Sequence, residues 1–211
     1  MLTVPSELDV LQPVDLPVLG SEPRERADAA RNRQKVLEAA ACLFARDGAD
    51  KVSMEAVAAH AGVGKGTLFR RFGDRANLAR AVLEQSERKL QDALIRGPAP
   101  LGPGAPPAER LAAFGAAYLE FLERHGDLIL AAEFGPAGFR LAHPVYAFYR
   151  THVTVLLREA GCGDRAEYLA DVLLAPLAAS MFRYQRGVRG LELGRLADEY
   201  RDLVCRLVAR A

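Results

Sequence analysis

Apolar residues recur along this chain with the three-to-four-residue spacing of amphipathic helices, and no segment shows the strict alternation of a strand. The first such series predicts a helix from about Ala29 to Arg46, with Gly48 just beyond its end. A strong amphipathic series near the C-terminus predicts a last helix over about 193–207. The pattern therefore predicts an all-α protein.

Two short helices joined by a glycine-bounded turn are predicted next. Ser53 is a good N-cap for a helix over about 54–61. A second short helix over about 64–71 turns Leu68 and Phe72 inward, because residues four apart share one helical face. This layout is typical of a helix-turn-helix, whose second helix enters the DNA major groove.

Prolines and glycines divide the rest of the chain. Asp74 is placed to cap a fourth helix from Arg75 to about Ile95. Residues 97–107 hold five of the twelve prolines, which predicts a linker or loop rather than a regular element. The predicted organisation is a flexible N-terminal arm over 1–23, a helix-turn-helix domain over 24–80, a continuation of the fourth helix over 81–96, the Pro/Gly-rich loop over 97–107, and a helical domain over 108–211.

The C-terminal domain is predicted to be helical throughout. A helix lined by Leu111 and Leu122 is followed by a shorter helical segment over about 126–134, and another helix covers 144–160. A long helix is predicted over about 164–186. Pro176 lies inside it and predicts a kink, because proline has no N–H to donate to the helix ladder.

The charge of the chain is unevenly distributed, although its net value is only +1. Residues 31–80 hold ten Lys and Arg against five Asp and Glu, whereas residues 1–23 carry four acids and no Lys or Arg. The basic excess coincides with the helix-turn-helix, where contacts to DNA phosphates need it. An excess of five is modest, and a solvated helix surface carries as much, so the charge supports the motif without establishing it.

Composition limits the cellular compartment in which the protein is expected to work. The 211 residues are 50% hydrophobic, which suits one or two compact domains, but no uninterrupted apolar run approaches a membrane span. The acidic first 23 residues do not match a secretory signal. Cys42, Cys162 and Cys205 are far apart and form no zinc or redox motif, so each is predicted to be a small core residue. A cytoplasmic protein without membrane partners is predicted.

The segment VSMEAVAAHAGVGKGTLFRRFGDRANL, residues 52–78, resembles the DNA-binding signature of the TetR family of bacterial transcriptional regulators. The resemblance covers about fifty residues, roughly a quarter of the chain. It implies an N-terminal three-helix helix-turn-helix module followed by a helical ligand-binding and dimerisation domain. It further implies a homodimer that binds double-stranded operator DNA and answers to a small-molecule effector, expected to be partly apolar.

Carried onto this chain, the resemblance places DNA contacts on the second helix of the motif and around it. Lys65 and Thr67 suit phosphates, and Arg70 suits a guanine edge or a phosphate. Arg71 either joins them or supports Asp74 or a neighbouring helix. The predicted DNA-binding residues are Arg31, Arg33, Ser53, Lys65, Gly66, Thr67, Phe69, Arg70, Arg71 and Arg75.

Two positions depart from the family pattern. Relatives commonly have tyrosine where this chain has Phe69, and the tyrosine hydroxyl tends to meet a backbone phosphate. Phe69 has no hydroxyl, so its ring is expected to pack on a sugar or on a thymine methyl. Arg75 stands where lysine is usual, and either side chain can meet a phosphate.

Aromatic residues dominate the candidate effector site, although each is also an ordinary core residue in the alternative interpretation. Helical domains bind small molecules between their helices. The candidates are Tyr118, Phe121, Phe134, Phe139, Tyr146, Tyr149, Arg150 and Phe182. By resemblance, the last two helices pair with their copies in a partner protomer as a four-helix bundle. The interface residues predicted on that basis are Leu169, Val172, Leu173, Tyr200, Val204 and Leu207.

Catalytic, metal and nucleotide sites find little support in the residues. The glycines around Lys65 fail the phosphate-loop pattern, and no serine sits in a Gly-x-Ser-x-Gly elbow. His143 and His152 lie nine residues apart on opposite sides of one helix, so they are not a metal pair. No enzymatic activity, cofactor or metal is expected. The favoured function is a ligand-responsive repressor; a helical binding protein or enzyme that has lost DNA binding, and a transcriptional activator, remain open.

Overall fold

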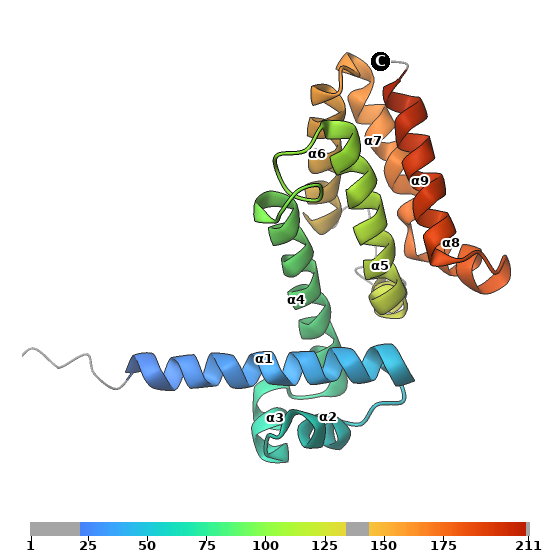
Figure 1. Cartoon of the computed structure of the whole chain (residues 1–211). Helices are drawn as coiled ribbons and strands as arrows, with labels where there is room; N and C mark the ends of the chain where they lie inside the picture. The colour runs from blue at the N-terminus through green and yellow to red at the C-terminus, as the bar shows by residue number, and fades with distance from the viewer. Residues whose placement is uncertain (1–21, 134–143, 210–211) are drawn as a thin grey trace, which may run out of the picture.

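The computed structural model describes residues 22–133 and 144–209, and every regular element within these two ranges is helical (Figure 1). The predicted residues Phe134, Phe139 and His143, and most of the predicted arm, lie outside the described residues. The helices are, in chain order, α1 (Glu22–Asp47), α2 (Met54–Ala61), α3 (Lys65–Phe72), α4 (Arg75–Arg96), α5 (Pro107–Glu133), α6 (Pro144–Glu159), the 3-10 turn η2 (Gly163–Arg165), α7 (Ala166–Leu174), the 3-10 turn η3 (Ala175–Leu177), α8 (Ala179–Arg183), the π-helical turn η4 (Tyr184–Val188) and α9 (Leu193–Val208).

The N-terminal domain has a core of its own, formed by α1, α2, α3 and the first half of α4. Leu37 and Ala40 of α1 are fully buried in it, together with Leu68 of α3 and Leu78 of α4. Figure 1 shows α1 lying across the motif, with α4 rising from it toward the second domain. This arrangement confirms the predicted all-α fold with an N-terminal helix-turn-helix.

Capping sets the limits of the short helices as the sequence predicts. The Ser53 side chain accepts a hydrogen bond of 3.1 Å from the Ala56 N–H at the start of α2. Gly62 ends that helix in the left-handed conformation, with φ of 65°, which favours glycine. At the start of α4, the Asp74 carboxylate accepts from the Asn77 N–H at 2.8 Å. The predicted bounds of α2, α3 and α4 are therefore right to within one residue.

The first helix begins earlier than predicted. It starts at Glu22 rather than near Ala29, so the end of the predicted arm is already helical. The apolar series from which the helix was predicted begins only where α1 meets the core, at Val36 and Leu37. Residues 28–35 of α1 include no buried side chain, so an apolar period cannot detect this part of the helix.

The C-terminal domain corrects two further predictions. Residues 107–133 form one helix, α5, instead of two, and Gly126 lies inside it. A glycine in a helix interior costs about 1 kcal/mol relative to alanine, which packing on both sides of it outweighs. Pro176 ends a helix instead of kinking it: α7 stops at Leu174, and Ala178 is extended before α8 begins. The missing N–H and the bulk of the ring account for the break.

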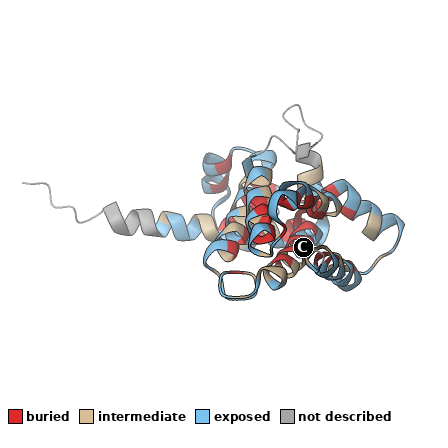
Figure 2. Ribbon diagram, turned by 90° about the horizontal axis from the view of Figure 1, so that it is seen from above, coloured by how far each residue is buried: buried red, intermediate tan, exposed pale blue. Residues whose placement is uncertain are grey.

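Helix α5 is the centre of the second core. It packs against α4, α6, α8 and α9, and α7 packs against α6. Figure 2 shows the buried residues on the inward sides of these helices. The fully buried side chains include Leu111, Phe114, Leu122, Val153, Leu157 and Leu173. Near its C-terminal end, α5 also places Leu128 against the core of the N-terminal domain. The same helix therefore contacts both domains.

Four residues predicted for the dimer interface are buried inside the protomer instead. Their periodic apolar positions mark the sides of α7 and α9 that face the protomer's own core, so they have almost no surface to give to a partner. These residues are Leu169, Leu173, Tyr200 and Val204. Val172 and Leu207 are only partly buried. The cysteine prediction is also corrected, because Cys162 is buried but Cys42 and Cys205 are exposed.

No described helix combines the length and the apolar character needed to cross a membrane.

Candidate DNA-binding surface and effector site

Helix α3 divides cleanly into a buried side and an exposed side. Leu68 and Phe72 face the core, which fixes the orientation of the helix on the domain. The outward residues predicted to meet DNA are all exposed, namely Lys65, Gly66, Thr67, Phe69, Arg70 and Arg71. The sequence prediction of a polar face on this helix is therefore right, whereas contact with DNA stays a prediction.

Lys65 is held by two neighbours. Its Nζ lies 2.5 Å from Oε1 of Glu55 and 5.6 Å from the centre of the Phe69 ring. The hydrogen bond from Lys65 keeps the pKa of the Glu55 carboxyl below its usual range. In contrast, Arg70 forms no ion pair or hydrogen bond within the described residues and extends into solvent. Among the described residues, Arg70 is thus a cation of α3 that has no intramolecular partner.

Arg71 and Arg75 hold the domain together. The Arg71 guanidinium donates a 2.8 Å hydrogen bond to the Ala29 carbonyl of α1. Arg75 donates to the Asp50 carbonyl in the turn before α2. Of the two roles open for Arg71, support of a neighbouring helix is observed. Both side chains remain exposed, so the structure leaves their DNA contacts untested.

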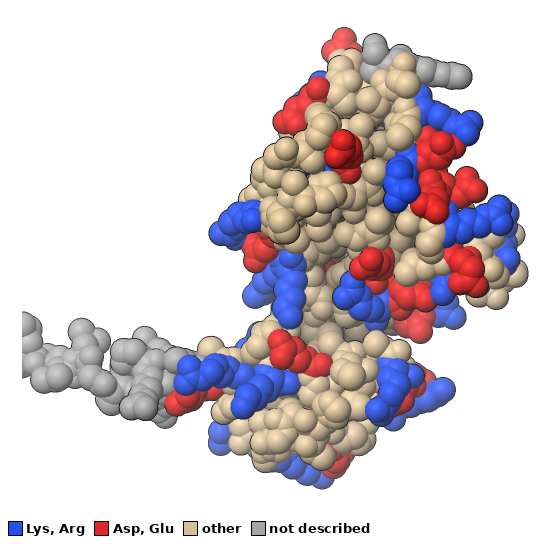
Figure 3. Space-filling view, in the orientation of Figure 1, with Lys and Arg blue, Asp and Glu red and all other residues tan. Residues whose placement is uncertain are grey.

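The remaining predicted DNA contacts lie on α1 and before α2. Arg31 is exposed and pairs with Asp28 one turn earlier, while Arg33 is partly buried. The Ser53 hydroxyl is already used as the cap of α2. In Figure 3, Lys and Arg side chains lie over the half of α1 nearest the N-terminus and again at the lower edge of this domain. The basic surface therefore extends beyond α3.

In the second domain, three of the predicted effector residues come together. The ring centre of Tyr118 lies 5.1 Å from that of Tyr149 and 5.7 Å from that of Phe121. Tyr146 packs beside this core but is partly exposed. Arg150 lies outside the cluster, because its Nε is 2.8 Å from Oδ1 of Asp171 on the surface.

Other residues belong to this region, of which Phe148 and Glu87 were not predicted from the sequence. Phe114 extends the aromatic cluster, with its ring centre 5.8 Å from that of Tyr149. Phe148 and His152 continue it along α6, with ring planes stacked at 8°. Glu87 of α4 is partly buried, and burial followed by repulsion from Glu84 raises the pKa of its carboxyl to about 7.

A signal for Glu87 exists in the sequence. Residues 83, 87, 90 and 94 lie on one face of α4, and Leu83, Leu90 and Leu94 all belong to the apolar side of that helix. An acid in the middle of such a row is unusual, because burial disfavours its charged form. Buried or partly buried carboxyls with a raised pKa are candidates for function for that reason.

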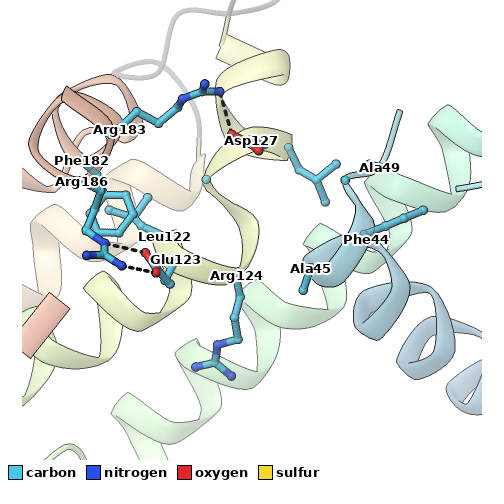
Figure 4. A pocket seen from close by; sticks show the side chains of 14 residues that line it. Phe44, Ala45, Ala49, Leu122, Glu123, Arg124, Asp127, Phe182, Arg183 and Arg186 are labelled. Carbon is cyan, nitrogen blue, oxygen red and sulfur yellow. Dashed lines mark hydrogen bonds and ion pairs between the residues drawn. The ribbon is translucent and has the colours of Figure 1, made fainter. Parts of the chain in front are cut away.

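Phe182 lines a different space. A pocket of about 300 Å³ lies where the end of α1 faces α5 and α8 (Figure 4). Its acids and two of its arginines are paired with each other: Nη1 of Arg183 is 2.7 Å from Oδ1 of Asp127, and Nη2 of Arg186 is 2.6 Å from Oε1 of Glu123. The pocket marks the junction of the two domains.

The fold and the exposed face of α3 define a helix-turn-helix protein with a second, helical domain. Residues 36–82 match the family model described as bacterial regulatory proteins, tetR family. The match covers the helix-turn-helix and the helices that pack against it, so this region is similar to the DNA-binding region of that family.

A short stretch of the chain is also similar to curated transcriptional regulators. An HTH-type transcriptional regulator from Staphylococcus aureus (strain USA300) is 40% identical over 60 residues, which cover 28% of this chain. The chain matches only about a third of the length of this curated relative, 32%. The identity is thus confined to 60 residues.

Solved structures share the fold along most of the chain. A protein from Saccharomonospora viridis, described as a transcriptional regulator and solved in complex with choline, aligns with a TM-score of 0.68 and 19% identity, over 83% of this chain and 96% of its own. A TetR-like transcriptional regulator from Rhodococcus sp. RHA1 aligns with a TM-score of 0.58 and 24% identity, over 85% and 97%. At these identities the likeness shows the fold alone.

Proposed function

We propose that this protein is a transcriptional regulator that binds a near-palindromic DNA operator as a homodimer and releases it when a small molecule binds the second domain. The observation that carries the proposal is the exposed polar face of α3, held on a capped helix-turn-helix within the region that matches the tetR family. DNA as partner means that the protein works in the bacterial cytoplasm, by binding rather than catalysis.

On the operator, α3 lies in the major groove. Arg70 reads a base edge, because it is exposed and free of any intramolecular ion pair. Lys65 and Thr67 contact phosphates and fix the position of the helix. Phe69, which is 37% exposed, offers an apolar surface for a thymine methyl or a sugar.

The homodimer places two copies of α3 about 34 Å apart, one turn of DNA. Its interface uses outward residues of α7 and α9, since the inward ones fill the protomer core. Tyr168 is 74% exposed, and Val172 lies one turn further along the same side of α7. Leu207 of α9 is also partly exposed. An exposed tyrosine beside aliphatic side chains is typical of the centre of a protein interface.

An effector acts by preferring one arrangement of the two domains. Helix α4 belongs to both cores, since Leu78 and Val82 pack in the N-terminal core and Leu90 and Leu94 in the other. A ligand bound between α4, α5 and α6 therefore acts directly on α4, the helix that follows the helix-turn-helix and packs against it. A ligand can bind more tightly to the domain arrangement in which α3 does not fit the major groove. It then lowers the affinity for DNA by at most the ratio of its own affinities for the two arrangements. The fold relative solved with choline supports a small-molecule effector.

The proposal is tested by charge reversal on α3. Purified protein is expected to retard DNA from the region upstream of its own gene, and the variant Lys65→Glu/Arg70→Glu is expected to lose at least 100-fold in affinity while staying folded and dimeric. The matched control is Arg96→Glu/Arg158→Glu, which reverses two exposed arginines outside the N-terminal domain. Equal retardation by both variants, or none by the wild type at low salt, would overturn it.

Repression is the proposed outcome of DNA binding, since a dimer on an operator near a promoter blocks polymerase. An activator would use the same contacts. Transcript levels of the neighbouring genes in a deletion strain separate the two: they rise if the protein represses and fall if it activates.

A further inference from the structure

The pocket at the domain junction, called the junction pocket below, combines apolar and charged lining. It is bounded by the C-terminal end of α1 on one side and by α5, α8 and η4 on the other (Figure 4). Ala45 and Ala49 of α1 and Leu128 of α5 supply apolar surface that is at least partly exposed, while Phe44 and Phe182 are buried members of the lining. Its volume of about 300 Å³ lies at the lower end of the range for ligand sites. The junction pocket therefore suits a small ligand with an apolar body.

One of the two ion pairs in this lining is complete. Nε and Nη2 of Arg186 lie 3.0 and 2.6 Å from the two carboxylate oxygens of Glu123, which is the strong bidentate geometry. Nη1 of Arg186 donates a further hydrogen bond of 2.8 Å to the Leu191 carbonyl. Every nitrogen of this guanidinium and both oxygens of this carboxylate are therefore already in use.

The second ion pair has unused capacity. Arg183 donates to Asp127 through Nη1 alone, at 2.7 Å, and its Nε and Nη2 make no hydrogen bond within residues 22–133 and 144–209. The pair is also open to water, since the side chains are 56% and 77% exposed. Exposed pairs of this kind contribute at most about 1 kcal/mol. A ligand carboxylate can therefore bind the remaining donors of Arg183, or replace Asp127, at little cost.

The charges of the lining favour an anionic ligand over a cationic one. Three arginines line the junction pocket, against two carboxylates. Both carboxylates, Glu123 and Asp127, already have an arginine partner, so a cation finds no unpaired acid there. A metal ion is not favoured either, because no group of three possible ligating residues exists in the part of the chain that the structure describes. The third arginine, Arg124, is paired with Glu120, which is not part of the lining.

We propose that the junction pocket is a second small-molecule site, separate from the space between α4, α5 and α6, and that it binds a small organic carboxylate with an apolar body. The carboxylate binds Arg183, and the apolar body packs against Leu128 and Ala45. The binding itself is independent of the proposed function, whereas its regulatory meaning rests on it. A ligand that contacts both α1 and α5 favours the present arrangement of the two domains, and so acts on how α3 is presented to DNA.

The test is a fluorescence titration of the full-length protein with 2-naphthoate and with its neutral isostere 2-naphthamide. The chain has no tryptophan, so the emission of the naphthalene ring is measured without a tryptophan background. Naphthoate is expected to bind about ten-fold more tightly than the amide, or better, because only the carboxylate forms charge-assisted hydrogen bonds with a guanidinium.

Two variants locate the binding. Arg183→Gln is expected to remove the preference for naphthoate, whereas Arg158→Gln, which changes an exposed arginine paired with Glu167 outside the junction pocket, is expected to keep it. Ala45→Leu fills the junction pocket from α1 and is expected to weaken both compounds about ten-fold. Arg183 and Ala45 are exposed, so both variants are expected to fold as the wild type does. Thermal unfolding of each variant checks this.

Equal affinity for the two compounds, no binding of naphthoate to the wild type, or wild-type behaviour of either Arg183→Gln or Ala45→Leu would overturn the inference. DNA retardation measured on the same samples keeps the two proposals separate. A wild type that retards DNA but does not bind naphthoate refutes only the junction site. One that binds naphthoate through Arg183 but never retards DNA refutes only the regulator.

Discussion

Gly115 of α5 lies directly against the ring of Tyr200 of α9. A β-carbon built on Gly115 would come within 2.0 Å of Cδ1 of Tyr200, far inside van der Waals contact. Tyr200 is itself 4% exposed and belongs to the core of the C-terminal domain. The close approach of α5 and α9 therefore depends on the absence of a side chain at position 115.

Gly115→Ala is expected to destabilise the protein by about 2 kcal/mol, because an overpacked site must shift an aromatic ring or separate two helices. The measurement is the free energy of unfolding in urea. Gly126→Ala is the matched control on the same helix, where the nearest atom to an added β-carbon is Cδ1 of Phe182 at 4.0 Å. There the gain in helix propensity, up to about 1 kcal/mol, is expected to stabilise. Equal stability of the two variants would contradict the packing described.

Glu87 is expected to make the protein less stable as pH rises. Its folded pKa of about 7 lies above its ordinary value of 4.5, so the folded state holds the proton longer than the unfolded state. The favourable contribution is complete below pH 4.5 and is lost as pH rises toward 7. At about 1.4 kcal/mol per pKa unit the upper limit is about 3 kcal/mol, and partial exposure reduces it to about 1–2 kcal/mol.

Glu87→Gln removes that dependence. The variant and the wild type are expected to differ least near pH 4.5, with the variant gaining about 1–2 kcal/mol relative to the wild type by pH 8. Urea unfolding at half-unit pH steps measures the difference. A difference that stays constant with pH would show that Glu87 titrates normally.

His125 is expected to act in the opposite direction. It is 7% exposed, and burial followed by the charge of Arg124 lowers its pKa to about 4 from 6.5. The unfolded state therefore binds the proton more readily, and stability is lost as pH falls from 6.5 to 4. His125→Phe keeps a ring beside Phe121, 5.0 Å away between centres in the wild type, without the charge. Its stability relative to the wild type is expected to rise as pH falls; parallel pH profiles would refute the assignment.

Glu55 is expected to weaken DNA binding. Its carboxylate holds Lys65 at 2.5 Å, and it brings a negative charge to the surface that meets phosphates. Glu55→Gln is expected to tighten operator binding several-fold at low salt. In the variant, Lys65 binds a DNA phosphate without first breaking its ion pair with the Glu55 carboxylate. Fluorescence anisotropy with labelled operator measures the change, and Glu159→Gln on α6 serves as a control remote from α3. A loss of affinity in Glu55→Gln would mean that the pair positions Lys65 rather than restraining it.

The sequence predicted the helix-turn-helix in detail because its limits are set locally. Ser53, Gly62 and Asp74 act on the backbone within three or four residues, so each of these helix ends has a signal in the local sequence. The break at Pro176 was placed correctly but its extent was not, since whether a proline kinks or ends a helix depends on what the next residues pack against.

Tertiary packing decided what the sequence left open. An apolar series on α7 and α9 predicts burial, but it does not say whether a partner or the same protomer covers it; here α6 packs against α7 and α5 packs against α9. The Arg71 contact with the Ala29 carbonyl spans 42 residues and leaves no local pattern. Glu87 stands as an acid in an apolar row of the sequence, but its partial burial depends on α5, which packs against α4.

The salt dependence of operator binding tests the central claim most directly. Anisotropy titrations between 50 and 200 mM salt give the slope of log affinity against log salt concentration. We expect a steep negative slope for the wild type. For the dimeric Lys65→Glu/Arg70→Glu variant, tested on residual binding at low salt, the slope should be shallower by about 2, because two phosphate-binding lysines are lost, one from each protomer. A slope that these substitutions leave unchanged would contradict the assignment of α3 as the DNA-reading helix.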